Sequence, residues 1–168
     1  MAGLQLAERI GSASLEGLPA PERDALARAI ARTFAGQVGD LPPAGERRWW
    51  RVVDTDAFDA WLIDWPPGTG VDRHDHAGSA ASLAVVRGRL VEERFDDDPT
   101  PVVAILRPGI VHRVAADVSH RVRNLAAAPA TSVHVYSPPL RAMGFYPDGS
   151  GPVRQSVDQD PTLWSTSL

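Results

Sequence analysis

The sequence predicts an all-β fold, a small barrel or sandwich of about eight short strands with two short helices packed outside. From Arg47 onward the apolar residues alternate with a period of two, and turn residues separate the alternating runs. The chain holds 14 Gly and 15 Pro, a high turn content that disfavours a helical bundle. Its length of 168 residues fits one domain with a single core.

The N-terminal segment, residues 1–36, is predicted to be helical. Pro21 suits a first helical turn, and Glu22 and Asp24 follow it where the positive end of the helix dipole favours acidic side chains. Gly36 ends the pattern, and a linker rich in Pro follows. The residues that recur with a helical period are Ala25, Leu26, Ala29, Ile30, Thr33 and Phe34.

The rest of the chain is predicted to be mainly strands, so we divide it into three parts. Residues 1–45 form the helical segment and linker, residues 46–146 form the barrel, and residues 147–168 form an extended tail rich in Pro, Gly, Ser and Asp. The predicted strands are 49–53, 57–65, 82–87, 89–95, 102–106, 110–114, 121–125 and 131–136.

The composition excludes several classes of function. The net charge of −4 disfavours binding to nucleic acid or to anionic membranes. All 17 basic residues are Arg, which excludes lysine chemistry, and the absence of Cys excludes disulfides, thiolate metal sites and a cysteine nucleophile. The N-terminus is too polar for a signal peptide, and no apolar run approaches the roughly 18 residues of a membrane span. We therefore expect a cytoplasmic protein, either a monomer or a small homo-oligomer.

Histidine placement is the most informative feature of the sequence. His74-Asp75-His76 is predicted to lie at the start of a strand, where alternation places both imidazoles on one face, and two imidazoles at this spacing can hold one metal ion. His120 and His134 lie on later strands that can fold back over this pair. His112 has no comparable surroundings and is interpreted as a packing residue.

Glycine and asparagine residues flank these histidines at characteristic spacings. Gly68 precedes His74 by six residues, Gly88 follows the second histidine by twelve, and Asn124 follows His120 by four. This pattern resembles the two motifs of the cupin superfamily, which implies a jelly-roll-like β-barrel with a metal in its mouth. Cupins usually carry a Glu ligand where this chain has Ala81. Three neutral imidazoles leave the full charge on a divalent metal and favour an anionic donor such as a thiolate, while the ligand count alone leaves iron and zinc open.

Ser132, His134 and Tyr136 alternate along one predicted strand and therefore share one face. Three polar side chains on one buried strand face need hydrogen-bond partners, and these three can form hydrogen bonds with one another. We predict that the row delivers the Tyr136 hydroxyl into a cavity. The alternative is an ordinary exposed strand face.

With this strand included, the sequence is similar to the cysteine dioxygenase family of thiol dioxygenases. The resemblance implies that Fe(II) is held by His74, His76 and His120, and that a small thiol reacts with O2 to give a sulfinate. The matching segments are Trp65-Pro66-Pro67-Gly68, His74 to Ser79, Val86 to Glu92, His120 to Asn124, and Ser132 to Pro139.

The resemblance also implies roles for individual residues. Tyr136 acts near the iron, with His134 and Ser132 as its relay. Arg51 is the expected partner of the substrate carboxylate, since a guanidinium offers two parallel donors, and Arg47 and Arg48 compete for the role. Substrate binding thus involves Arg51, Tyr136 and also Met143, which is expected to line the pocket, with an ordinary core position as the alternative.

Two departures narrow the choice of substrate. Ala81 stands where some family members have a Cys that crosslinks to the tyrosine, so Tyr136 must act unmodified. The 3-mercaptopropionate dioxygenases carry an Arg where this chain has Phe145, so L-cysteine is the preferred substrate. The alternatives are a dioxygenase for another thiol such as 3-mercaptopropionate or a cysteamine-like amine, a non-catalytic metal-binding cupin, and a zinc hydrolase.

Overall fold

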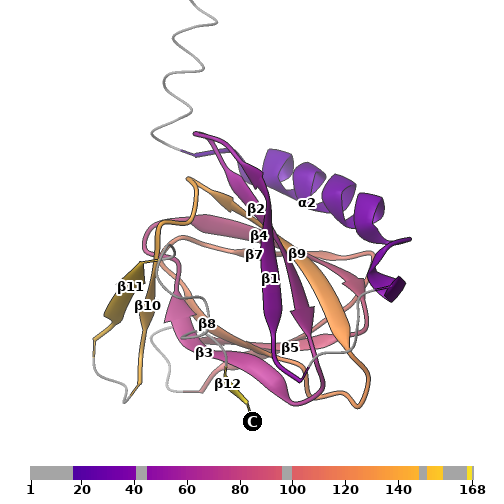
Figure 1. Cartoon of the computed structure of the whole chain (residues 1–168). Coiled ribbons are helices and arrows are strands. Elements are labelled where there is room, and N and C mark those ends of the chain that lie inside the picture. The colour runs from indigo at the N-terminus through magenta and orange to yellow at the C-terminus, as the bar shows by residue number, and fades with distance from the viewer. Residues whose placement is uncertain (1–16, 41–44, 96–99, 148–150, 157–165, 168) are drawn as a thin grey trace, which may run out of the picture.

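The computed structural model describes residues 17–40, 45–95, 100–147, 151–156 and 166–167. It confirms the predicted all-β fold: two antiparallel sheets face each other, and one helix packs on the outside (Figure 1). The elements are α2 (Ala20–Phe34), η1 (Val38–Asp40), β1 (Arg48–Asp54), β2 (Asp59–Trp65), β3 (Thr69–Asp75), β4 (Ala80–Arg87), β5 (Leu90–Phe95), β6 (Val102–Leu106), β7 (Val111–Val114), β8 (Ser119–Arg123), β9 (Ala130–Ser137), β10 (Ala142–Phe145), β11 (Val153–Ser156) and β12 (Thr166–Ser167).

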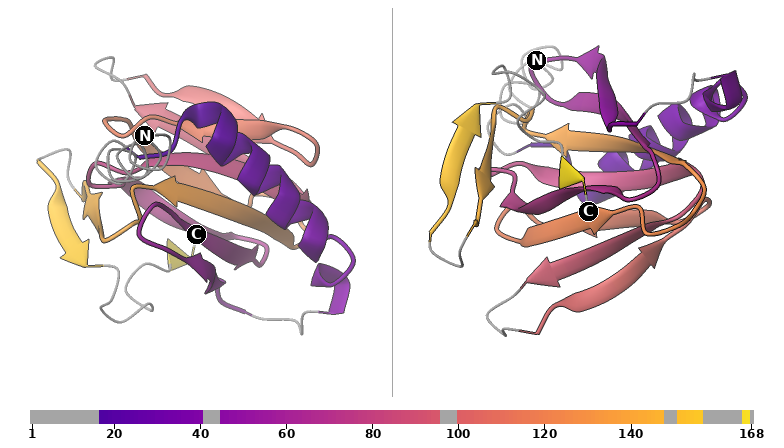
Figure 2. Two further views of the ribbon diagram at one scale, coloured as in Figure 1. Left: turned by 90° about the horizontal axis from the view of Figure 1, so that it is seen from above. Right: turned by 60° about the horizontal axis from the view of Figure 1, so that its bottom comes forward.

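The two sheets differ in size and in what covers them. The five-stranded sheet has the order β1-β2-β9-β4-β7, and α2 lies across its outer face (Figure 2). The seven-stranded sheet has the order β11-β10-β3-β8-β5-β6, with β12 paired to β3. Strands that are distant in sequence are thus neighbours: β9 lies between β2 and β4, and β8 lies between β3 and β5.

Strand β9 is buried along its whole length because both of its faces are covered. Val133 and Val135 face outward and pack in a cluster with Ala27 of α2. The alternate residues of the strand face the interior between the sheets, and Tyr136 belongs to that inner cluster. Helix α2 therefore covers the outer face of β9, the strand whose inner face carries Ser132, His134 and Tyr136.

One acidic residue fixes α2 to this sheet. Asp24 is buried, and its carboxylate accepts hydrogen bonds from Ser82 at 2.7 Å and from the Nη2 of Arg113 at 2.7 Å. Both donors project outward from strands of the five-stranded sheet, β4 and β7. Asp24, just after the first turn of α2, thus fixes the helix to the sheet, while Glu22 is the acidic residue of the first turn that the helix dipole favours.

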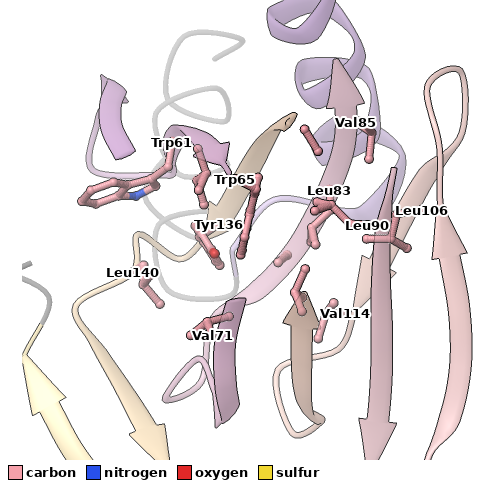
Figure 3. Close-up of a cluster of buried hydrophobic side chains, with 14 of the residues drawn as sticks. Trp61, Trp65, Val71, Leu83, Val85, Leu90, Leu106, Val114, Tyr136 and Leu140 are labelled. Atoms are coloured by element: carbon pink, nitrogen blue, oxygen red, sulfur yellow. The ribbon is translucent and has the colours of Figure 1, made fainter. Parts of the chain in front are cut away.

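The main core fills the interior between the two sheets (Figure 3). At one end Leu83, Leu90 and Leu106 pack together, each at most 1% exposed. At the other end Tyr136 lies near Trp61 and Leu140 in the same cluster, and the polar atoms of Tyr136 and of Trp65 take part in the site described below.

Three sequence expectations need correction or restriction. Strand β3 was missing from the predicted strands, because its glycines and charged residues resemble a loop; it places His74-Asp75 at the end of a strand rather than at its start. In the tail, 147–168, the described parts form β11 and β12, which pair with β10 and β3. Only one α-helix lies in the described part of the N-terminal segment, and residues 1–16, where further helix was predicted, lie outside it.

Candidate metal centre and adjoining cavity

Three histidine side chains from the seven-stranded sheet converge in the barrel interior. His74 lies in β3, His76 directly follows that strand, and His120 lies in β8 opposite His74 in the antiparallel register. One ring nitrogen from each forms a group within 4.8 Å of one another, and all three residues are at most 3% exposed. The spacing of the first two residues and the pairing of the strands together create the cluster.

The backbone around β3 is adapted to this convergence. A Cβ on Gly70 would lie 2.9 Å from the carbonyl oxygen of Val122, so glycine lets β3 approach β8 closely. After the strand, the carboxylate of Asp75 accepts a hydrogen bond from the backbone N–H of Ala77 at 2.8 Å, which holds the turn that follows His76. The register of β3 against β8 also shifts between Val71 and His74.

Hydrogen bonds fix the tautomers of two of the imidazoles. His74 Nδ1 lies 2.7 Å from the carbonyl oxygen of Asp72, and His120 Nδ1 lies 2.8 Å from Oε1 of Glu92. Carbonyl and carboxylate oxygens only accept, so both Nδ1 atoms carry a proton, and Nε2 is the nitrogen of each ring that can offer its lone pair to a metal. The Nε2 atoms of His76 and His120 lie 3.1 Å apart.

This donor set fits a divalent metal ion. Burial, followed by the repulsion of neighbouring imidazoles, lowers the pKa of His74 and His76 well below the ordinary value, so both rings are neutral at pH 7. Adjacent ligands about 2.1 Å from one metal and at right angles to each other are about 3 Å apart, which agrees with the His76–His120 separation. Neutral, oriented imidazoles at this spacing are the form that metals bind.

Beside the histidine cluster, the inner face of β9 carries one continuous hydrogen-bonded row. Trp65 Nε1 donates to Ser132 Oγ at 2.9 Å, Ser132 lies 3.0 Å from His134 Nε2, and His134 Nδ1 lies 3.1 Å from the Tyr136 hydroxyl. All of these residues are at most 5% exposed. The three predicted residues therefore do serve one another, and Trp65 extends the row.

The protonation states along this row follow from its burial. Burial lowers the pKa of His134 to about 3, so the ring is neutral and carries a single N–H. Ser132 Oγ accepts from Trp65 Nε1, and the arrangement that satisfies every group in the row has the Ser132 hydroxyl donate to His134 Nε2 and the His134 Nδ1–H donate to the Tyr136 oxygen. The Tyr136 proton is then free to point into the interior, and burial keeps the phenol protonated by raising its pKa.

A cavity of about 40 Å³ adjoins both the histidines and the tyrosine. That volume holds a few water molecules, so the cavity suits a small ligand. Its polar lining comprises Arg47, His74, His120, His134 and Tyr136. Its apolar lining includes Trp49, Trp61, Ile63, Trp65, Leu140 and Met143, so the expected position of Met143 agrees with the structure.

The three candidate arginines occupy different places. Arg47 lines the cavity, is 8% exposed, and lies over the rings of Trp49 and Trp65 at 4.9 and 5.1 Å. Burial lowers the pKa of Arg47 to about 10, which leaves it cationic at neutral pH. Arg51 bonds the exposed carboxylate of Asp54 at 3.0 Å, and Arg48 bonds Asp64 at 2.7 Å; neither belongs to the cavity lining.

Two other residues clarify the sequence comparison. Ala81 of β4 lies directly opposite Tyr136 of β9, the position from which a cysteine could reach the tyrosine. His112, interpreted as a packing residue, is half-buried in β7 and is absent from the three-histidine group.

Glu92 is the site residue that sequence reasoning missed as a functional group. It was counted only as part of a matching segment, yet it is fully buried and contacts His120. Burial raises the pKa of a carboxylate, but hydrogen bonds from His120 and Arg94 outweigh this and hold the pKa of Glu92 below its ordinary value. The signal available in the sequence was an acidic residue two positions after Leu90, on the face of β5 that points inward.

The part of the chain that the structure describes holds no helix with the length and apolar character that a membrane crossing needs.

Comparisons with known proteins agree with this geometry. The sequence model of the family Cysteine dioxygenase type I matches residues 43–148, which contain every element of the site. Cysteine dioxygenase type 1 of Danio rerio is 28% identical over 104 residues, covering 56% of this chain and 52% of the relative. The Homo sapiens protein of the same name is 32% identical over 92 residues, covering 49% and 46%. The chain thus spans about half the length of the curated relatives it matches.

Solved structures support the fold. The TT1209 protein of Thermus thermophilus aligns with a TM-score of 0.53 and 24% identity, covering 61% of this chain and 95% of the other. Oxalate oxidase in complex with glycolate aligns with a TM-score of 0.52 and 17% identity, covering 64% and 58%. At these identities the likeness concerns the two-sheet barrel alone.

Proposed function

The chain belongs to the cysteine dioxygenase type I family, and on this premise we propose that it is an iron-dependent thiol dioxygenase. The proposed reaction oxidises a small thiol carboxylate, L-cysteine before others, to its sulfinate with O2. The observation that carries the proposal is the group formed by His74, His76 and His120 beside a hydrogen-bonded tyrosine in a small cavity.

The three histidines would hold Fe(II) through their Nε2 atoms, the nitrogens left with lone pairs in His74 and His120. When bound, ferrous iron would bring the thiolate sulfur and O2 together. Because the imidazoles are neutral, the histidines do not cancel the charge of the metal, and an anionic thiolate is favoured over a neutral thiol.

Arg47 is the residue that we assign to the substrate carboxylate. Its guanidinium is cationic and buried in the lining of the cavity, where attraction to an anion is stronger than in water. Arg51 was preferred from the sequence, but it lies outside the lining and bonds Asp54. The geometry therefore favours Arg47 over Arg51 as the carboxylate partner.

Tyr136 is assigned the role of a hydrogen-bond donor to a substrate oxygen. His134 and Ser132 orient its proton, since their hydrogen bonds occupy the acceptor side of the phenol oxygen. The indoles and aliphatic side chains around the cavity limit the water that can enter with the substrate.

The test is oxygen consumption by the anaerobically Fe(II)-loaded protein with L-cysteine, with the sulfinate measured as product. We expect one O2 to be consumed for each sulfinate formed, and a lower kcat in Tyr136→Phe. Parallel assays with 3-mercaptopropionate and cysteamine rank the substrates. Stoichiometric iron binding without thiol-dependent O2 consumption in any of these assays would contradict the proposal and favour a non-catalytic metal-binding protein.

A further inference from the structure

A fully buried carboxylate lies directly behind one of the three histidines. Glu92 of β5 is 0% exposed, and its Oε1 is 2.8 Å from His120 Nδ1, the nitrogen that faces away from the cluster. Its other oxygen, Oε2, accepts a hydrogen bond from Arg94 Nε at 3.0 Å and forms an ion pair with Arg94 Nη2 at 2.8 Å. The antiparallel pairing of β5 with β8 sets Arg94 opposite His120.

We propose that Glu92 is a positioning residue that orients His120 for metal binding and supplies the negative charge that the three imidazoles lack. The proposal rests on the metal site described under Proposed function. A carboxylate that accepts the Nδ1–H bond holds the ring with Nε2 toward the metal and makes that nitrogen a stronger donor. The charge lies one imidazole away from the metal and leaves the coordination positions free for substrate.

The location of Glu92 argues against a purely structural role. On the inward face of β5 its neighbour is Leu90, which is part of the apolar core, and an apolar residue at position 92 would avoid the cost of desolvating a carboxylate. Arg94 bonds only Oε2, so Oε1 remains directed at His120. The carboxylate thus accepts a hydrogen bond from the imidazole of His120 and also pairs with the partly exposed guanidinium of Arg94.

The first test compares Glu92→Gln with a matched control, Glu93→Gln. Glu93 is the next residue of the same strand, but its carboxylate bonds Arg121 and Arg123 on the outside, away from the histidines. Fe(II) affinity is measured anaerobically by competition with a chromophoric chelator. We expect Glu92→Gln to bind Fe(II) about 10–100-fold more weakly than wild type and Glu93→Gln to match wild type within about twofold.

Thermal unfolding separates positioning from folding. A structural role would lower the unfolding temperature of the metal-free protein, whereas the proposed role reduces the rise in that temperature when Fe(II) is added. Failure of wild-type protein to bind Fe(II) would contradict the proposed function itself. Binding by wild type and Glu92→Gln with equal affinity would overturn only this inference.

A second variant keeps the inference testable if Glu92→Gln does not fold. Arg94→Gln removes a cation that offsets the Glu92 charge and that repels a divalent metal. We therefore expect its Fe(II) affinity to rise by a few-fold, the opposite sign to Glu92→Gln. A structural role predicts weaker binding in both variants, so unchanged or weaker binding by Arg94→Gln would refute the charge argument.

Discussion

Substitution of Arg47 by Met tests which arginine holds the substrate, because it removes the guanidinium and keeps most of the stem that packs on Trp49 and Trp65. Arg47 is only 8% exposed, so a bound carboxylate that loses this partner stays largely desolvated. Removing one partner of such a pair costs about 2–5 kcal/mol. We take the lower part of that range because the cavity opens to solvent. The KM for L-cysteine should then rise about 30- to 100-fold, at 1.4 kcal/mol for each factor of ten.

The assay is steady-state O2 consumption by the iron-loaded variant, with Arg51→Met as the matched control. Arg51 pairs with the half-exposed Asp54, so its loss should change KM by less than about threefold. Cysteamine lacks a carboxylate, and its KM should be nearly unaffected by Arg47→Met. A larger KM effect from Arg51→Met, or equal losses for cysteine and cysteamine with Arg47→Met, would refute the assignment.

Three further outcomes follow from the same geometry. His120→Ala should abolish iron loading and leave the circular dichroism of the barrel intact; full iron occupancy would refute its place among the ligands. Tyr136→Phe should lower kcat about 10–100-fold, the cost of one buried hydrogen bond, with Fe(II) affinity unchanged; an unaltered kcat would exclude the hydroxyl from the reaction. Metal-free protein should lose stability as pH falls from about 6.5 toward about 3. The upper value is the pKa of histidine in the unfolded chain, and the lower is the pKa of His134 in the folded protein, where burial lowers it. Between the two, protons bind the unfolded chain in preference to the folded one. Asp59 has the opposite effect, because burial raises its folded pKa to about 6, and the stability that it adds at low pH is lost as pH rises through that value. The measurement is the free energy of unfolding from denaturant titrations between pH 3 and 7. A free energy of unfolding that increases on acidification would contradict the histidine argument.

Local pattern predicted the fold well wherever strands had one consistent face. The inner row of β9 followed from alternation alone, because its polar and apolar residues are cleanly separated. Strand β3 was missed because its pairing with β8 depends on the absence of a side chain at Gly70, a requirement set by a strand some fifty residues away. The local pattern of a sequence shows which face of a strand is apolar, but it says little about which strands distant in sequence pack closely together.

The arginine assignment shows the same limit at the site. Arg47 and Arg51 are both two steps from Trp49, so both fall on the same face of an ideal strand. The choice between them depends on where β1 begins against β2 and on the register shift after Arg51. That information belongs to the pairing of two strands, and no single strand encodes it.

The charges in the barrel interior lie on different sides of the histidine group. Arg47 is in the cavity lining with Tyr136, whereas Glu92 lies behind His120, on the Nδ1 side of its ring. A cation beside the substrate weakens metal binding and attracts an anionic ligand, while a carboxylate behind a ligand strengthens metal binding. The two charges therefore act in opposite directions on Fe(II) affinity: Glu92 raises it, and this gain offsets the loss caused by the nearby Arg47. It follows that Arg47→Met should tighten Fe(II) binding while it weakens substrate binding, a combination that loss of packing alone cannot produce.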